Sequence, residues 1–217
     1  SANVALGTTN CTGTLNSQVN TASDSRTIYA FSNAAADKLR SFVWGNLTST
    51  EQGYFSGSLL SQWPALSTAQ KASVTGTNFI NYLRGQFGFE DQDGNPSDDR
   101  VFRNRERILG DIVGSQPVFV KKPFFNYTDL EYTNFKSSAA SRAPTVFIAA
   151  NDGMLHAFNA DTGVERWAYV PNVVIPELYR LADTAYTSNH RYYVDGSPAV
   201  ADVCIANCAN TAAPLPV

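Results

Sequence analysis

The sequence predicts a mainly β fold of antiparallel meanders, with a few helices in its N-terminal third and long insertions. Three β-rich segments alternate with two turns between Thr145 and Pro171, which is the pattern of a meander. A turn-and-strand segment that begins at Val113 is echoed about 80 residues later, which indicates internal repetition. Two helix-start signals lie between residues 48 and 84, so the helices are expected early in the chain.

The meander is the clearest part of the chain. Val146–Ala150 is apolar, and the Asn-Asp-Gly sequence at residues 151–153 predicts a tight hairpin turn after it. Met154–Phe158 returns along the first strand. A second turn is expected at residues 159–163, where a glycine can take a positive φ, and Val164–Val170 forms the third strand.

The segments before the meander are less regular. Residues 1–25 are rich in Ser, Thr, Asn and Ala and predict an irregular lead-in. Arg26–Phe31 is β-rich and alternating, which predicts a strand. Residues 85–103 are rich in glycine and acid and predict a long surface loop. Strands are also expected at residues 112–113 and 117–120, followed by an aromatic insertion at 124–141.

Two capping boxes predict where the helices begin. Thr48 with Glu51 opens a helix that is expected to run to about Leu60. Ser67 with Gln70 opens a second, expected to run to about Leu83. In each box the first side chain and the last satisfy one another's free backbone amides, so the signal defines the helix start.

The repeated segments read VGSQPV from Val113 and VDGSPAV from Val194, and each is a turn with proline that leads into an apolar strand. Repeated meanders that pack radially form a β-propeller, and this chain supplies about two blades of such a ring. We therefore expect an incomplete β-propeller domain over residues 26–217. It would hold a helical insertion at about 48–84, the acidic loop at 85–103 and blade strands at 108–217, with open strand edges that favour self-association.

Composition argues against nucleic acid as a partner, because the net charge is −3 and the charged residues of both signs are dispersed. A hydrophobic content of 43% is sufficient for a real core. No apolar run approaches the roughly 20 residues that cross a bilayer, and the first residues lack the pattern of a signal peptide. An exported protein would then have lost its signal or would continue a longer chain.

Three stretches, in this order, resemble the PilC/PilY family of type IV pilus-tip adhesins: Arg107–Val120, Ala149–Pro171 and Leu178–Val203. The resemblance covers roughly half of the chain, from Arg103 onward. It implies a C-terminal β-propeller with quinoprotein-like blades, placed at the pilus tip or outer cell surface and in the periplasm during transit. The implied role is non-catalytic and lies in pilus assembly, retraction control and adhesion, with pilin or minor pilin subunits and host-surface ligands as partners.

Two other functions stay open at this point. Trp167, four residues after Gly163, resembles the tryptophan-docking blades of quinone-dependent (PQQ-type) dehydrogenases, which makes a fragment of such an enzyme the main alternative. The chain has no adjacent cysteine pair and too few blades for that cofactor, so Trp167 is more simply a packing residue between blades. A periplasmic propeller scaffold is the other alternative.

A calcium site is the sharpest local candidate for binding chemistry. Asp91, Asp93 and Asn95 alternate as oxygen ligands do in calcium loops, and Asp99 follows close behind. The glycine, however, stands at the fourth place of the loop, and Phe102 occupies the twelfth place, where a bidentate Glu is expected. A solvated acidic turn is the favoured interpretation, and the resemblance places the family's own calcium loop in a later blade.

The cysteine count is odd, since only Cys11, Cys204 and Cys208 are present. A disulfide between Cys204 and Cys208 that closes a small loop is favoured over two free thiols, given the secreted-type composition. Cys11 has no assigned partner. A metal is disfavoured there because neither of the two histidines has a second cysteine pair nearby.

No catalytic residue is predicted. His156 lies within a strand and is interpreted as a packed, hydrogen-bonded residue. The carboxylates beside Gly153 and Gly163 are explained by the two hairpin turns. The aromatic groups at residues 124–127 and 191–193 could form a recognition surface, but packing is favoured because strand aromatics are usually buried.

Overall fold

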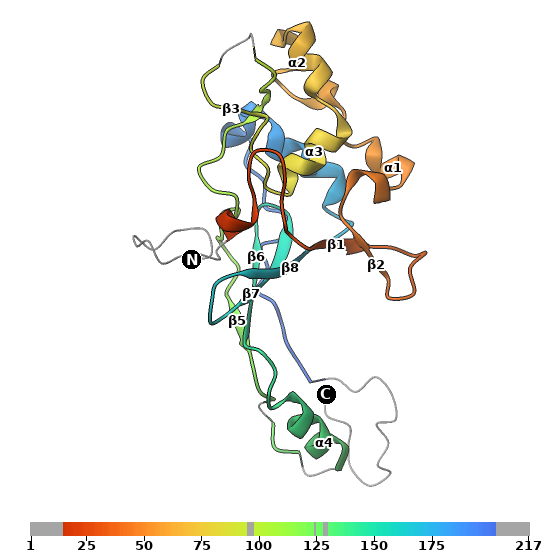
Figure 1. Cartoon of the computed structure of the whole chain (residues 1–217), viewed down its shortest axis with the longest axis vertical. Helices are drawn as coiled ribbons and strands as arrows, with labels where there is room; N and C mark the ends of the chain where they lie inside the picture. The colour runs from red at the N-terminus through yellow and green to blue at the C-terminus, as the bar shows by residue number, and fades with distance from the viewer. Residues whose placement is uncertain (1–14, 95–97, 124, 128–129, 203–217) are drawn as a thin grey trace.

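The structure is a computed structural model that describes residues 15–94, 98–123, 125–127 and 130–202. A six-stranded sheet with the order β2-β1-β8-β7-β6-β5 forms its centre (Figure 1). Four of its five strand pairs are antiparallel, and only β1 and β8 run parallel. The predicted mainly β class with antiparallel meanders and a few early helices is confirmed.

Four consecutive strands make up the blade: β5 (Val118–Val120), β6 (Thr145–Ala150), β7 (Met154–Asn159) and β8 (Glu165–Val170). Each pairs with the next in antiparallel register, as the meander pattern predicts. The register of β7 on β8 shifts once, between Ala157 and Phe158. A shift of this kind bends a strand and increases its twist.

The predicted strand near residue 28 is also confirmed, as β1 (Ile28–Phe31), and its partner comes from far away in the sequence. β1 lies parallel to β8, with Ile28 opposite Ala168, and β2 (Leu39–Ser41) completes that edge of the sheet. The N-terminal part of the chain is therefore attached to the outer strand of the blade. Nothing local in the sequence predicts this pairing.

Both capping boxes are present, but both helices are shorter than expected. α1 spans Ser49–Gln52 and ends at Gly53, after which the chain continues in single 3₁₀ turns. α2 spans Thr68–Ser73, and a new helix, α3, covers Gly76–Leu83. The expected single helix divides because the hydroxyl of Thr75 accepts from the amide of Asn78 and so starts a helix of its own.

The main hydrophobic core lies where the helical segments meet the sheet and the 3₁₀ helices at Ile175–Ala182 and Thr184–Ser188 (Figure 1). Phe79 of α3 and Phe102 are fully buried, with ring centroids 4.8 Å apart, and Met154 of β7 is buried in the same cluster. A smaller cluster consists of Leu15, Ile148 and Phe158. The remaining short 3₁₀ helices are Leu15–Gln18, Trp44–Asn46, Gly57–Leu59 and Trp63–Ala65.

Three predictions on strands and loops differ from the structure. Residues 85–103 do not form a continuous loop, because β3 (Glu90–Asp91) and β4 (Phe102–Arg103) pair in parallel within them. The sequence predicts blade strands to the end of the chain, but residues 171–202 form 3₁₀ helices and irregular chain instead. Residues 112–113 likewise lie outside any strand.

The insertion after β5 folds into a helix that the sequence did not predict. α4 spans Leu130–Ala139 and lies at the far end of the molecule from α2, beyond the β5 edge of the sheet (Figure 1). The Tyr132 hydroxyl donates to the Asp202 carboxylate at 2.8 Å. The insertion is therefore tied to the segment that follows the 3₁₀ helices.

The two copies of the repeated segment lie side by side. The amide of Gly114 donates to the Asp195 carboxylate at 2.8 Å, and the amide of Gln116 donates to the Ser197 hydroxyl at 3.0 Å. Both contacts join residues 81 positions apart, so the segments run in the same direction without a shift. The echo in the sequence therefore corresponds to neighbouring segments in space.

The glycines of the two hairpin turns provide a test of the meander. Gly153 has φ +89°, and a Cβ added there would lie 2.4 Å from a methyl carbon of the buried Leu178. Gly163 has φ +73° but open space around it. Because an L-residue with positive φ costs about 1–2 kcal/mol, we expect Gly163→Ala to lower the free energy of unfolding by that amount. Gly153→Ala should lower it further, since Leu178 must also move.

Urea denaturation of both variants checks this expectation. The Gly163→Ala variant serves as the control, because it carries the backbone strain without the steric contact. Equal losses of unfolding free energy in the two variants would contradict the packing of Leu178 against the first turn.

Candidate functional site

A buried ion pair joins the N-terminal segment to the blade. Arg26 precedes β1, and Glu165 is the first residue of β8; they are 5% and 3% exposed. The guanidinium donates twice to the carboxylate, from Nε to Oε2 at 2.7 Å and from Nη2 to Oε1 at 2.9 Å. This two-point geometry is the strongest form of an arginine–carboxylate contact.

His156 extends the ion pair into the blade. Its ring is fully buried in β7, and Nδ1 lies 2.7 Å from Oε1 of Glu165. Nε2 lies 3.1 Å from both carboxylate oxygens of Asp152, in the turn between β6 and β7. The interpretation of His156 as a packed, hydrogen-bonded residue is confirmed. Asp152 does more than form the turn, because it is the second carboxylate of the histidine.

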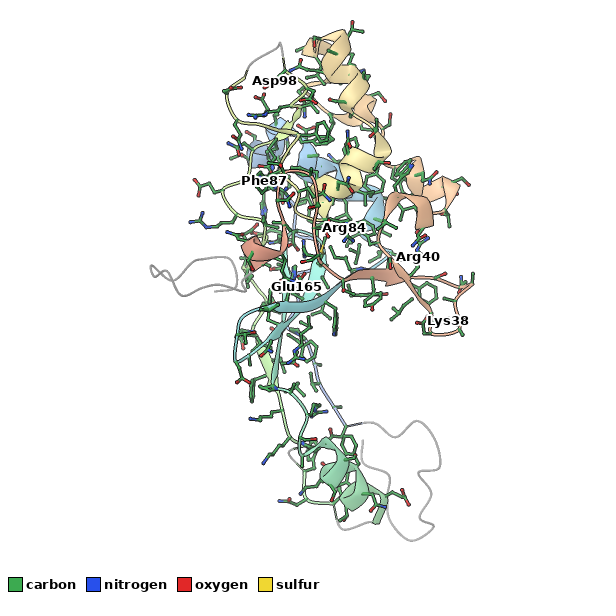
Figure 2. The ribbon with its side chains drawn as sticks, in the orientation of Figure 1. Lys38, Arg40, Arg84, Phe87, Asp98 and Glu165 are labelled. Carbon is green, nitrogen blue, oxygen red and sulfur yellow. The ribbon has the colours of Figure 1, made fainter. Side chains whose placement is uncertain are left out.

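The network also extends into the helical segment. The Arg84 guanidinium, directly after α3, forms an ion pair with Asp24 and donates to the carbonyl of Arg26 at 2.8 Å. Arg26 donates in turn to the Arg84 carbonyl at 2.8 Å. Figure 2 shows Arg84 between the helical segments and the sheet and Glu165 on the sheet below it. Three cations therefore face three carboxylates across the junction.

The charged groups of the network offset the effect of burial on one another's pKa values. Burial alone would lower the pKa of His156, but the nearby carboxylates of Asp152 and Glu165 raise it to about 9. Burial alone would raise the pKa of Glu165, but His156 and Arg26 lower it to about 2. At neutral pH the histidine is charged and both ring nitrogens donate hydrogen bonds, so it has no lone pair for use as a base.

The lead-in segment is held to the same strand. The amide side chain of Gln18 accepts from the backbone amide of Glu165 at 3.0 Å and donates to its carbonyl at 3.1 Å. Residues on both sides of Asp24 are therefore bound to the start of β8. The network therefore connects the lead-in, the end of α3, β1, β7 and β8.

The acidic segment contributes Glu90 to a third arginine–carboxylate pair. Glu90 is buried and accepts from Nε of Arg105 at 2.7 Å and from its backbone amide at 3.0 Å. The Arg105 guanidinium also lies 3.7 Å from the centroid of the Tyr82 ring. The first acid of the loop thus stabilises the fold and does not face solvent.

The residues of the candidate calcium site are only partly described, since Asn95 lies outside the described residues. The carboxylate of Asp91 accepts from the amide of Gly94 at 2.7 Å, and the carbonyl of Asp99 accepts from the Ser73 hydroxyl at 2.7 Å. Asp93 also has an interaction partner. Over the described ranges, no three His, Cys, Asp or Glu side chains come together as metal ligands would. The calcium site stays a prediction, with the solvated turn as the favoured form.

Isothermal calorimetry tests this interpretation directly. We expect no saturable heat when calcium is added to the metal-stripped protein, and no difference between it and an Asp91→Ala, Asp93→Ala variant. Saturable heat that disappears in the variant would establish a calcium site in the loop and overturn the solvated turn.

The other sequence candidates have different outcomes. Cys204 and Cys208 lie outside the described residues, as does Cys11, so the proposed disulfide stays a prediction. Trp167 is half-buried, and its ring centroid lies 5.7 Å from that of Phe147 within the same blade. Among the aromatic groups, Phe125 is 44% exposed and Tyr192 is 65% exposed, so packing does not account for all of them.

The fold and the network together define a class of protein: a β-propeller-type blade whose buried histidine is stabilised between carboxylates, with a helical segment fixed to its outer strand. Residues 109–211 match the family model described as the PilY1 beta-propeller domain. This part of the chain belongs to the PilY1 β-propeller family. The propeller assignment made from the sequence is thereby confirmed.

Relatives extend the similarity beyond the matched domain. A type IV pilus biogenesis factor PilY1 from Pseudomonas aeruginosa strain UCBPP-PA14 is 34% identical over 193 residues, which cover 84% of this chain. A PilY1 homolog from Xylella fastidiosa is 44% identical over 132 residues, which cover 57% of this chain. The aligned parts are 15% and 10% of these relatives, so the chain corresponds to a small part of their length. No solved structure gives a significant match.

The described residues also bear on the expectation of no membrane span. Within them, no helix has both the length and the apolar character required to cross a bilayer. The relatives themselves are named as type IV pilus biogenesis factors.

Proposed function

We propose that this chain acts as a non-catalytic, pilus-associated surface segment that contributes to pilus assembly, control of retraction and adhesion. The observation that carries the proposal is the PilY1 propeller match together with relatives named as type IV pilus biogenesis factors. In this role the blade is a scaffold, and its β5 edge makes the contacts together with the segments that project from it.

The chemistry of the blade supports a scaffold. The most perturbed groups of the described chain include His156 and Glu165, which are buried and hydrogen-bonded to one another. A catalytic histidine must exchange a proton with a substrate, whereas both nitrogens of His156 face carboxylates of the protein. Its perturbed pKa is thus accounted for by the ion-pair network, which holds two parts of the chain together.

Exposed apolar groups at the β5 edge support a role in contacts with other proteins. Phe119 of β5 is 48% exposed, Phe125 lies in the insertion that follows, and Val200 lies in the facing segment at 49% exposed. Large exposed apolar side chains that lie close together are typical of interaction surfaces. Pilin or minor pilin subunits and host-surface ligands are the partners we propose, with the pilus tip or outer cell surface as the location and the periplasm as the transit compartment.

Complementation in a bacterium that carries this gene tests the function. The complete gene is deleted and restored as wild type, as a Phe119→Ser, Phe125→Ser variant, and as a Val173→Ser control. Val173 is 84% exposed but does not line the hollow at the β5 edge, which Phe119, Phe125 and Val200 help to form. We expect the deletion to lose surface pili and twitching motility, and the double variant to lose adhesion or pilus number at normal protein level. Normal piliation, motility and adhesion in the deletion strain would overturn the proposal.

A further inference from the structure

A hollow of about 350 Å³ lies beside the segment that connects β4 to the blade. One wall comes from Arg103, Leu181 and Tyr186, and another comes from Asp111 and the β6–β7 turn with Asp152. Small-molecule sites in proteins begin at about 300 Å³, so the hollow is large enough for a sugar ring or an amino-acid side chain.

The charges that line the hollow are unequally satisfied. Arg105 forms an ion pair with Glu90, and Asp152 is paired with His156, while Nε2 of His190 lies 3.1 Å from the Asp111 carboxylate oxygens. Arg103 and Arg107 also line the hollow, and neither forms an ion pair with an acid anywhere in the described ranges. After the pairs of Arg105 with Glu90 and of Asp152 with His156 are set aside, Arg103 and Arg107 remain beside Glu106 and Asp111. Asp111 is hydrogen-bonded to His190, so the two arginines are the lining cations that are free to receive an anion.

Arg103 is held in place although it has no acidic partner. Its Nε donates to the carbonyl of Leu181 at 2.9 Å, and the guanidinium carbon lies 4.7 Å from the centroid of the Tyr186 ring. Leu181 and Tyr186 are both buried, so these contacts fix the half-buried arginine on a rigid wall. An arginine held by a ring and a carbonyl retains N–H groups in a planar fork, which fits a carboxylate at two points.

We propose that this hollow binds a small carboxylate-bearing ligand, with Arg103 as the two-point anchor and Arg107 as the second cation. Asn104 and Thr187, which are exposed and line the same hollow, supply neutral hydrogen-bonding groups for the rest of the ligand. The ligand is an acidic sugar or an acidic amino-acid side chain, since both present a carboxylate on a body of suitable size. The site is additional to the scaffold function and does not depend on it.

Nuclear magnetic resonance titration of the ¹⁵N-labelled chain tests the site with four probes. D-glucuronate and N-acetyl-L-glutamate carry the carboxylate, while D-glucose and N-acetyl-L-glutamine are their neutral counterparts. We expect saturable shifts of the Arg103 Nε–H signal and of the backbone amides of residues 103–111 with at least one of the two acids. The acid that binds more tightly identifies the source of the carboxylate. Equal binding of an acid and its neutral counterpart, or no binding of either acid, would overturn the proposal.

Variants separate a bound carboxylate from general attraction to a cationic surface. Loss of a hydrogen bond to a charged group weakens binding by about tenfold or more, so we expect that loss in Arg103→Gln. Arg103→Lys keeps the charge but not the planar fork, so we expect its affinity for the acid to lie between those of the wild type and Arg103→Gln. Arg107 is exposed, so Arg107→Gln tests the second cation without risk to folding. Arg166→Gln, on the exposed face of β8, is the matched control and should bind as wild type does. Unchanged binding in both Arg103→Gln and Arg107→Gln would refute the site, whatever happens to pilus function.

Discussion

Replacement of Arg26 by Met is expected to lower the free energy of unfolding by about 3–5 kcal/mol. The substitution keeps most of the side-chain volume but leaves the buried Glu165 carboxylate without its two-point partner. It also removes the hydrogen bond from Arg26 to the Arg84 carbonyl. A buried charge that loses its partner retains its desolvation cost, which is why the effect greatly exceeds that of an exposed ion pair. Urea denaturation followed by circular dichroism measures the loss.

Arg166→Met is the control for this variant. Arg166 directly follows Glu165 on β8, but its side chain is exposed, so the same chemical change should alter the unfolding free energy by no more than about 0.5 kcal/mol. Arg26→Lys, which keeps the charge but not the fork, should be intermediate. A loss below about 1 kcal/mol in Arg26→Met would show that the network does not stabilise the junction.

The same network predicts a pronounced dependence of stability on pH. The pKa of His156 is about 9 in the folded protein and 6.5 without its surroundings. Protonated His156 therefore contributes fully to the free energy of unfolding below about pH 6.5. This contribution, on the order of 3 kcal/mol, is lost as the pH rises through 9. The pKa of Glu165 falls from 4.5 to about 2, so its contribution is complete above pH 4.5 and is lost as the pH falls through 2. The contributions of these two groups are therefore both complete between about pH 4.5 and 6.5.

Thermal unfolding from pH 5 to pH 9.5 checks the alkaline limb. We expect the melting temperature of the wild type to fall above pH 6.5, and the curve of His156→Gln to be lower throughout but flatter over the same range. Parallel curves for the two proteins would mean that His156 does not carry the alkaline loss of stability.

The parts of the fold that could be predicted are those with local signals. The strands β6, β7 and β8 follow from an apolar run and two turn sequences within 30 residues, and Gly153 and Gly163 take the positive φ that their turns require. The capping boxes gave both helix starts for the same reason. Helix ends were wrong because no equally specific signal marks them, and because Thr75 acts as a new cap inside the expected helix.

Most contacts of the candidate site cannot be predicted from the sequence. Arg26 and Glu165 are 139 residues apart, and their contact depends on the parallel pairing of β1 with β8. The strand position of His156 predicts a packed residue, but no local signal identifies either of its carboxylate partners. One signal was available, because an arginine, a histidine and a glutamate at β-rich positions must each find partners when buried. That rule indicates the need for partners but does not say which residues supply them.

The N-terminal helical segment and the blade form one cooperative unit, which the Arg26–Glu165–His156 network joins. Hydrogen exchange followed by mass spectrometry measures this most directly, by comparing wild type with Arg26→Met under native conditions. We predict that protection falls together in β1, α3, β7 and β8, because loss of the junction loosens both sides at once. Loss of protection in the helical segment alone, with β7 and β8 unchanged, would contradict the claim and show two independent units.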